Sequence, residues 1–268
     1  GAVIILIFSF SFVEPLLKLF GATGNVLVYA ADYLRINFNY SIVIFLFVGI
    51  SNALQGSGDA KTPLYALIIA NILNIILDPL LIMGYGPFPS LGVAGSAIAT
   101  VITRGVGVLF LFIHLIFGHS TIHLKIKSLK PIPSLMKRIV SIGFFASLQA
   151  FIREISFLFL MRLVTSFGAV TLAAYGIGSR LRMFIMVPGF GFAGAAAVLV
   201  GQNLGAKKSR RAEKAVWQAL RYYEILLAPA VIIFIFFAPK LVGFFNTHAE
   251  VIAIGSSFLR YLAVTLPF

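Results

Sequence analysis

The residues best suited to chemistry lie close together in one apolar stretch, the string NILNIILDP at 71–79. Asn71, Asn74 and Asp78 are spaced i, i+3 and i+7, which places them on one face of a helix. A glycine-rich turn with one lysine, GSGDAKT at 56–62, precedes this stretch. Two amides and a carboxylate cost free energy to hold in a lipid-embedded helix, so the pattern predicts an ion or substrate pathway.

Asp78 is the strongest candidate for coupling chemistry. Desolvation favours the protonated form of a carboxylate, so Asp78 can take up and release a proton within a membrane. With oxygen neighbours it can instead bind Na⁺, and Asn74, one turn earlier on the same face, supplies an amide oxygen. Asp78 and Asn74 are therefore a candidate metal site for Na⁺ as well. The alternative is that Asp78, directly before Pro79, caps an irregular helix end at the membrane interface.

The composition predicts that helices in a membrane position these side chains. The chain is 60% apolar and 11% charged, with a mean hydropathy of +1.03, which is typical of polytopic membrane proteins. At roughly 20 apolar residues per span, it holds about eight helices. The run Val231–Phe237 is continuously apolar, and Tyr65–Leu77 is apolar apart from Asn71 and Asn74, whereas the strands of a membrane barrel alternate. The expected fold class is an all-α, polytopic transmembrane helical bundle.

The distribution of basic residues predicts the topology. We expect spans at about 1–20, 31–55, 62–84, 92–117, 138–166, 170–202, 215–238 and from 250. Lysines and arginines concentrate in the connectors at 56–61, 118–137 and 203–214, whereas the connectors at 85–91 and 167–170 carry no charge. The positive-inside rule places the basic connectors in the cytoplasm. This topology, and not nucleic-acid binding, accounts for the formal charge of +13.

An internal repeat indicates two halves. A shift of 225 positions pairs five residues without gaps: Phe20 with Phe245, Val26 with Val251, Tyr33 with Phe258, Leu34 with Leu259 and Arg35 with Arg260. Parallel repeats of this kind occur in secondary transporters; chance similarity between apolar segments is the alternative. We expect part of an N-terminal bundle at 1–118, a cytoplasmic connector between bundles at 119–137, and part of a C-terminal bundle at 138–268.

Two longer strings carry a resemblance to a known family. GSGDAKTPLYALIIANILNIILDPLLIMGYGPFPSLGVAGSAIATVITR and FGAVTLAAYGIGSRLRMFIMVPGFGFAGAAAVLVGQNLGAKKSRRAEKA resemble multidrug and toxic compound extrusion (MATE) transporters. The resemblance implies two pseudo-symmetric six-helix bundles, of which this chain is an internal fragment. It also implies export of cationic or amphipathic compounds in exchange for Na⁺ or H⁺. Similar proteins place polar groups on helices beside the Asn74 and Asp78 positions, and here Asn52, Ser96 and Thr100 are the candidates.

Glu154 is a further candidate for cation or proton coupling. It lies in the string AFIREISFLFLMR of the fifth predicted span, and one branch of the family uses a glutamate on that helix to bind the coupling cation. The alternative is an ion pair with Arg153 or Arg162, because arginine is a usual partner for a membrane carboxylate.

The sequence therefore predicts a multi-pass protein of a bacterial or archaeal cytoplasmic membrane that exports small cationic or amphipathic compounds by alternating access. We expect no enzymatic activity, since no hydrolase or transferase constellation is visible, and no cofactor apart from the coupling ion. We expect contact with membrane lipids, no nucleic-acid partner and a monomeric state. Two alternatives stay open: a lipid-linked oligosaccharide flippase of the same superfamily, and a membrane scaffold that transports nothing.

Overall fold

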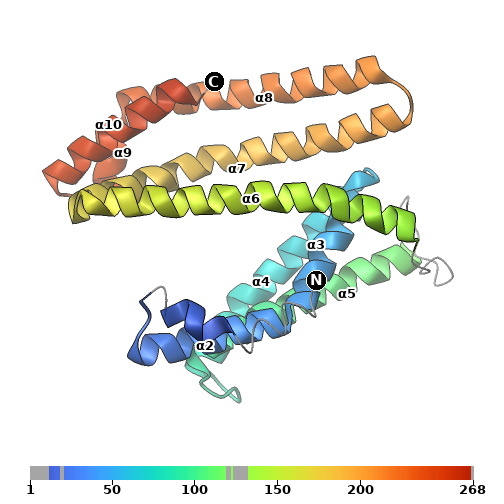
Figure 1. The fold of residues 1–268 in the computed structure, drawn as a ribbon, viewed down its shortest axis with the longest axis horizontal. Coiled ribbons are helices and arrows are strands. Elements are labelled where there is room, and N and C mark those ends of the chain that lie inside the picture. Colours follow the sequence, from blue (N-terminus) through green and yellow to red (C-terminus); the bar gives the residue numbers. More distant parts are fainter. Residues whose placement is uncertain (1–11, 19–20, 119–121, 123–131, 267–268) are drawn as a thin grey trace. The chain divides into compact units, whose positions relative to one another are not determined.

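The computed structural model describes residues 12–18, 21–118, 122 and 132–266. Every regular element in these ranges is a helix, and none is a strand, which confirms the predicted all-α class (Figure 1). The chain divides into two compact units, one up to Ser128 and one from Leu129. The division falls inside the predicted connector at 119–137, most of which lies outside the described residues.

Unit 1 is built from α2 (Gly24–Asn39), α3 (Ser41–Gly56), α4 (Lys61–Met83) and α5 (Gly92–Phe117), preceded by a helical segment at 12–18. Helices α4 and α5 are each long and apolar enough to cross a membrane. The turn at 57–60, between α3 and α4, marks one end of unit 1, which we call the turn end. The segment at 84–91, between α4 and α5, marks the opposite end, which we call the connector end.

The helix pair α2 and α3 differs from the single predicted span at 31–55. The two helices meet at Tyr40 with a bend of 51°, and α2 begins at Gly24. The break lies in the string INFNYS at 36–41, whose asparagine and serine side chains compete with the backbone for hydrogen bonds. One of them, Asn37, donates its Nδ2 to the Tyr33 carbonyl at 2.9 Å. The break thus falls at a cluster of short polar residues, within a stretch that is apolar enough to be one span.

Close contacts between α4 and α5 hold the antiparallel pair in register. A Cβ atom on Gly95 would lie 2.5 Å from the Leu81 carbonyl oxygen, so only glycine admits this approach. At the turn end, Thr62 Oγ1 lies 3.1 Å from His114 Nε2. Small residues at helix contacts are the usual way for membrane helices to approach closely.

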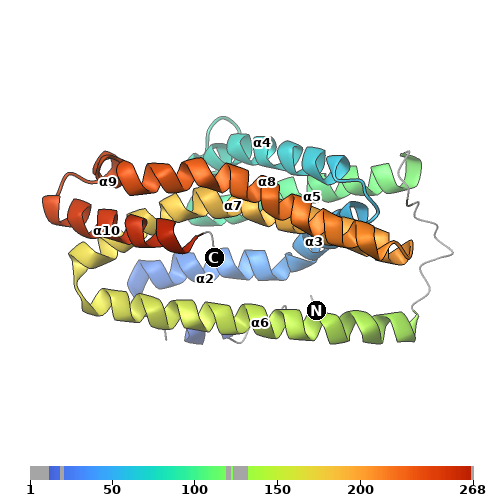
Figure 2. The ribbon, with the colours of Figure 1, turned by 90° about the horizontal axis from the view of Figure 1, so that it is seen from above.

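Unit 2 consists of α6 (Pro133–Ser166), α7 (Ala169–Gly205), α8 (Ser209–Phe236), α9 (Ala238–Phe245) and α10 (Ala249–Thr265). Helices α7 and α8 run side by side, as both views show (Figures 1 and 2). Helix α6 begins before the predicted residue 138, because Pro133 occupies a first-turn position where its missing N–H costs nothing. None of the residues of α6 is buried. Together with the bent pair of unit 1, up to six membrane-spanning candidates are present among the described residues.

The predicted repeat has a structural counterpart. The segment at 12–18 followed by α2 matches α9 followed by α10, with starting residues Gly24 and Ala249 that differ by 225 positions. Each arginine of the repeat contacts a residue of a helix that precedes its own. Arg35 forms an ion pair with Glu14 at 2.6 Å, and Arg260 Nε donates to the Ile235 carbonyl at 3.3 Å.

Candidate functional site

The Asn74 and Asp78 side chains continue the inner stripe of α4. The buried residues of this helix include Thr62, Ala66 and Ala70, at intervals of four. Asn74 and Asp78 follow at the same interval and are half-buried. Within the described part of the chain, Asn74 Nδ2 and Asp78 Oδ1 are buried without a hydrogen-bond partner.

Such unpaired atoms are exceptions, because buried polar atoms in proteins almost always have partners. Helix α4 continues through Pro79 to Met83, so Asp78 lies within the helix and not at its end. Proline has no N–H, so the carbonyl of Ile75 also loses its usual helical donor. A carboxylate oxygen, an amide and a backbone carbonyl without its helical bond are thus gathered on one turn of α4.

Ser96 and Thr100 lie on the neighbouring helix α5, and both are half-buried. The antiparallel register places Asn74 near the depth of Thr100 and Asp78 near the depth of Ser96, within about 3 Å along the helix axis. No hydrogen bond joins these four described side chains; the Thr103 hydroxyl, one turn on, donates to the Thr100 carbonyl at 3.1 Å. The structure therefore brings these predicted residues to one level of unit 1 without pairing them.

Asn52 and Asn71 are not brought to this site. Asn52 is exposed and lies four residues before the end of α3, about 6 Å from the turn end at 1.5 Å per residue. Asp78 lies about 25 Å along α4 from its first residue by the same rise. Asn71 is exposed, although it shares a helical face with Asn74 in the sequence pattern.

Glu154 lies on α6 in unit 2 and is exposed. Arg153 and Arg162 are exposed on the same helix, and neither of these described residues forms an ion pair with Glu154. The alternative role for Glu154, an ion pair with one of these arginines, therefore has no support in this unit. Its role in cation coupling remains a prediction.

The sequence analysis missed a second group of polar side chains, at the break between α2 and α3. Ser41 is 7% exposed, and its Oγ has no partner in the described part of the chain. The same holds for Oδ1 of the half-buried Asn39. The available signal was the string INFNYS, which places three short polar residues in the middle of a predicted span.

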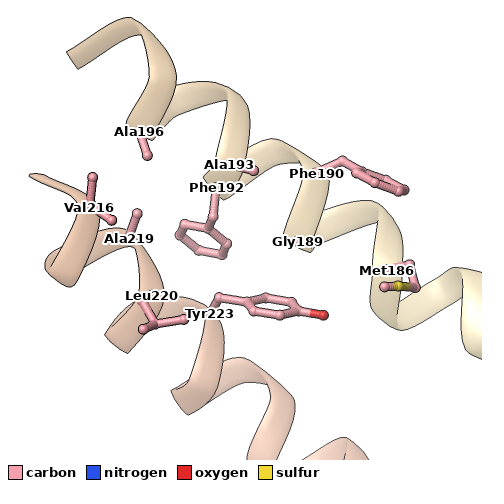
Figure 3. Close-up of a pocket in the computed structure, with 10 residues that line it drawn as sticks. All are labelled: Met186, Gly189, Phe190, Phe192, Ala193, Ala196, Val216, Ala219, Leu220 and Tyr223. Atoms are coloured by element: carbon pink, nitrogen blue, oxygen red, sulfur yellow. The ribbon is translucent and has the colours of Figure 1, made fainter. Parts of the chain in front are cut away.

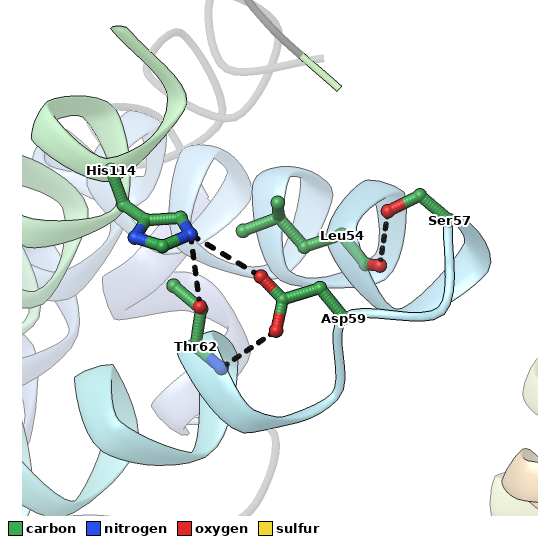
Figure 4. Close-up of polar contacts among 5 residues, drawn as sticks. All are labelled: Leu54, Ser57, Asp59, Thr62 and His114. Atoms are coloured by element: carbon green, nitrogen blue, oxygen red, sulfur yellow. Dashed lines mark hydrogen bonds and ion pairs between the residues drawn. The ribbon is translucent and has the colours of Figure 1, made fainter. Parts of the chain in front are cut away.

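A polar cluster at the turn end fixes the start of α4 against the end of α5 (Figure 4). Asp59 Oδ1 accepts the backbone N–H of Thr62 at 3.1 Å, and Asp59 Oδ2 lies 3.3 Å from His114 Nε2. Burial alone would raise the pKa of Asp59, but hydrogen bonds from Thr62, the nearby His114 and the Lys61 N–H outweigh it and lower this pKa. Asp59 therefore stays ionised and anchors both helices that carry the candidate site.

Unit 2 contains an apolar pocket of about 370 Å³ between α7 and α8 (Figure 3). The rings of Phe192 and Tyr223 lie 6.4 Å apart within it, tilted by 49°. Gly189 makes room for the tyrosine, because a Cβ there would lie 2.9 Å from the ring. The Tyr223 hydroxyl is the polar side-chain group in the lining (Figure 3). A pocket of this size and character suits the apolar part of a small ligand.

The arrangement does not resemble a site for a transition metal. Among the described residues, no three His, Asp or Glu side chains gather closely enough to hold a metal ion. One carboxylate with amide and hydroxyl oxygens is instead a donor set suited to a proton or a hard monovalent cation.

Comparison with known proteins identifies the family. Residues 2–80 and 146–268 match the MatE family model. The chain belongs to the MatE family. It is 28% identical over 270 residues to a probable multidrug resistance protein, YoeA, of Bacillus subtilis, covering 98% of this chain and 57% of that protein. It is 29% identical over 257 residues to an FAD transporter of Shewanella oneidensis, covering 96% of this chain and 56% of that protein.

Solved structures of MatE transporters show the same fold. A crystal structure of MATE in the bent conformation matches with a TM-score of 0.89 and 26% identity, covering 99% of this chain and 58% of that one. The chain thus spans a little over half the length of these relatives. Its MatE membership and its long apolar helices establish a multi-pass integral protein of the cytoplasmic membrane, and its relatives are transporters, not enzymes.

Proposed function

We propose that this MatE protein exports small cationic or amphipathic compounds in exchange for H⁺ or Na⁺ by alternating access. One observation carries the proposal: on a membrane-length helix, Asp78 Oδ1 and Asn74 Nδ2 are buried and unpaired. Intramembrane carboxylates mark ion and proton pathways in membrane proteins. The multidrug and FAD transporters among the relatives support a role in moving small compounds.

The coupling step follows from the chemistry of these side chains. A proton would neutralise the Asp78 carboxylate, whereas Na⁺ would bind its oxygens together with amide and hydroxyl oxygens at the same depth, those of Asn74, Ser96 and Thr100. Either cation stabilises the conformation in which these groups are brought together. A substrate that prefers the other conformation shifts the equilibrium back, and this difference in affinity couples the two fluxes.

The substrate is proposed to be amphipathic because of the pocket between α7 and α8. Its aromatic and small side chains fit an apolar ring system, and nearby aromatic faces also favour cations through cation–π contact. The flippase alternative would require several arginines within the membrane; one arginine of this kind, Arg104, lies over the Phe47 ring, 5.1 Å from its centroid.

Transport by the native protein in proteoliposomes tests the proposal. Ethidium movement is followed under an imposed proton gradient and, separately, under an imposed Na⁺ gradient. We expect one gradient to drive transport and Asp78→Asn to abolish it, while the purified variant keeps the wild-type melting temperature. Unchanged transport by Asp78→Asn would assign this residue to helix packing, and no transport under either gradient would favour the flippase or the scaffold.

A further inference from the structure

A second polar stripe runs along α2 in unit 1. Asp32, Arg35 and Asn39 are spaced i, i+3 and i+7, so they share one helical face. Near the connector end, Glu14, Asp32 and Arg35 line a cavity of about 130 Å³. This volume holds several water molecules. The Glu14–Arg35 ion pair of 2.6 Å forms one side of the cavity.

Farther from the connector end, the stripe carries polar atoms that have no hydrogen-bond partner. Arg35 Nε is a donor and Asn39 Oδ1 is an acceptor, and both are buried without a partner in the described part of the chain. They lie one turn apart on the same face, so a water molecule between them would satisfy both. Ser41 Oγ, directly past the break, is the next unpaired atom. Broken membrane helices with such groups commonly line ion sites.

The break lies at the depth of the candidate coupling site. A Cβ atom on Gly107 of α5 would lie 2.6 Å from the Phe47 ring of α3, which fixes these parallel helices in register. Ser41 precedes Phe47 by six residues, and Thr100 precedes Gly107 by seven. At equal rise per residue, Ser41 and Thr100 therefore lie at about the same depth. The inner end of the α2 stripe therefore lies at about the same depth as the candidate coupling site of Asn74 and Asp78.

The repeat shows that the fold does not require this polarity. The positions in unit 2 that correspond to Glu14, Asp32 and Asn39 hold Pro239, Ser257 and Val264. The arginine is kept as Arg260, but its Nε donates to the backbone carbonyl of Ile235. One copy of the helix–turn–helix unit is thus stable with a single arginine tied to the backbone. Glu14 pairs with Arg35 in unit 1, as the Ile235 carbonyl pairs with Arg260 in unit 2. Asp32 and Asn39 have no carboxylate or amide counterpart in the second copy, which favours a role for them beyond folding.

We propose that the cavity lined by Glu14, Asp32 and Arg35, continued by Asn39 and Ser41, is the entry path of the coupling cation. This proposal rests on the proposed function, because it assigns a route to the same cation. Two carboxylates against one guanidinium leave the cavity one negative charge, which concentrates cations at its mouth. The path opens at the connector end, which is the outer side if the basic connectors are cytoplasmic.

Cysteine labelling tests the path without relying on transport. These 268 residues contain no cysteine, and any cysteine elsewhere in the native protein is first replaced by serine. In the native protein, Asn39→Cys is exposed to membrane-impermeant cationic and anionic thiosulfonates added outside. We expect labelling from outside, about tenfold faster with the cationic reagent, and loss of this preference when Asp32→Asn is added. Tyr40→Cys is the matched control. Tyr40 is the next residue along the chain and its side chain is 53% exposed, but it lies off the stripe. Equal or faster labelling at position 40 would overturn the path.

A transport arm separates this proposal from the proposed function. In proteoliposomes, Asp32→Asn should raise the half-saturating outer cation concentration several-fold and leave the maximal rate near wild type. Glu250→Gln, an exposed carboxylate at the start of α10, should change neither. If Asp32→Asn keeps the wild-type half-saturating cation concentration while Asp78→Asn transports nothing, the entry path is overturned and the proposed function is not. Normal transport by Asp78→Asn would instead overturn the proposed function, and the labelling result would still decide whether the path exists.

Discussion

Asp78 and Asn74 differ from the other polar residues of α4 in being both buried and unpaired. Thr62 is also buried, but its hydroxyl lies beside His114 and its N–H bonds to Asp59. Asn71 is exposed, so it is not among the buried, unpaired side chains in the described part of the chain. The free energy stored in an unpaired buried group is released when a ligand pairs with it. Asp78 Oδ1 is therefore the atom with which a proton or Na⁺ would pair. The unpaired atom of Asn74 is the donor Nδ2, so a cation would contact Asn74 through its Oδ1.

Asn74→Leu should weaken cation binding. The change keeps the number and branching of the side-chain heavy atoms but removes an oxygen ligand that contributes about 1.5 kcal/mol to a charged partner. The half-saturating cation concentration should therefore rise about tenfold. Cation-dependent ethidium transport in proteoliposomes measures this shift. Asn71→Leu is the control, and an equal shift in that exposed variant would contradict a specific role for Asn74.

Asp59→Asn should remove a pH-dependent contribution to stability. The folded-state pKa of Asp59 is lowered from its ordinary value of 3.8, so ionised Asp59 stabilises the folded state. This contribution is fully present above pH of about 4 and disappears as the pH falls through the lowered pKa. Melting temperatures in detergent should therefore differ between wild type and variant at pH 7 and converge as the pH falls through the lowered pKa of Asp59. A gap that stays constant over this range would contradict the assignment.

The sequence predicted only some of the residues that form the polar groups of unit 1. Asp78, Asn74, Ser96 and Thr100 were predicted, and the structure places them at one level. Asn52 was predicted from the family and lies near the turn end, because the sequence alone does not give depth across two helices. Asn39 and Ser41 were missed, since a helix break cannot be seen from an apolar average over the span.

At the scale of elements, the close α4–α5 pair is what brings the candidate residues to one depth. The approach depends on Gly95 and on the Asp59 cluster at the turn end, which together hold the two ends of the pair. The bent α2–α3 pair packs against the same helix α5. Helix α5 therefore packs against all three helices that carry the polar groups of unit 1: α4, α2 and α3.

Gly95→Leu should destabilise unit 1. A side chain at this position meets the Leu81 carbonyl oxygen, and such overpacking costs about 1–3 kcal/mol because backbone must move. The measurement is the melting temperature of the purified protein in detergent. Gly105→Leu, on the same helix with open space around its Cβ position, should melt close to wild type. Equal losses in both variants would show that leucine is disfavoured on α5 generally and that the contact is not special.

Element boundaries were predictable where a local rule decides them. The apolar runs gave α4 and α5 to within a residue or two, because Gly84 and Gly92 adopt positive φ at their ends. The early start of α6 needed the first-turn role of Pro133 to be recognised. The 51° bend at Tyr40 falls inside a stretch that is apolar enough to be one span, so hydropathy does not report it.

At the scale of the molecule, composition and the repeat determine what the chain can be. A mean hydropathy of +1.03 and long apolar helices require a membrane, and the 225-residue offset appears both in sequence and as paired helix–turn–helix segments. Function could not be predicted from composition. It required the family strings, and the match to the MatE model confirmed the family that they indicate.

The topology is testable because the chain is free of cysteine. Ser90→Cys lies in the uncharged connector, and Ser209→Cys lies at the start of α8, beside the basic connector. An impermeant maleimide should label Ser90→Cys in intact cells and Ser209→Cys only after permeabilisation. Both positions are exposed, so accessibility within the protein does not limit either reaction. The reverse pattern would place the α2 stripe on the cytoplasmic side.

Substrate-driven cation movement tests the central claim of cation-coupled export most directly. Proteoliposomes with the native protein receive an ethidium gradient but no gradient of H⁺ or Na⁺, and internal pH and Na⁺ are followed with fluorescent indicators. Because coupling is reciprocal, ethidium flux should move one cation in the opposite direction, and Asp78→Asn should abolish this counterflow. Ethidium movement by the wild-type protein without any opposing cation movement would contradict the account.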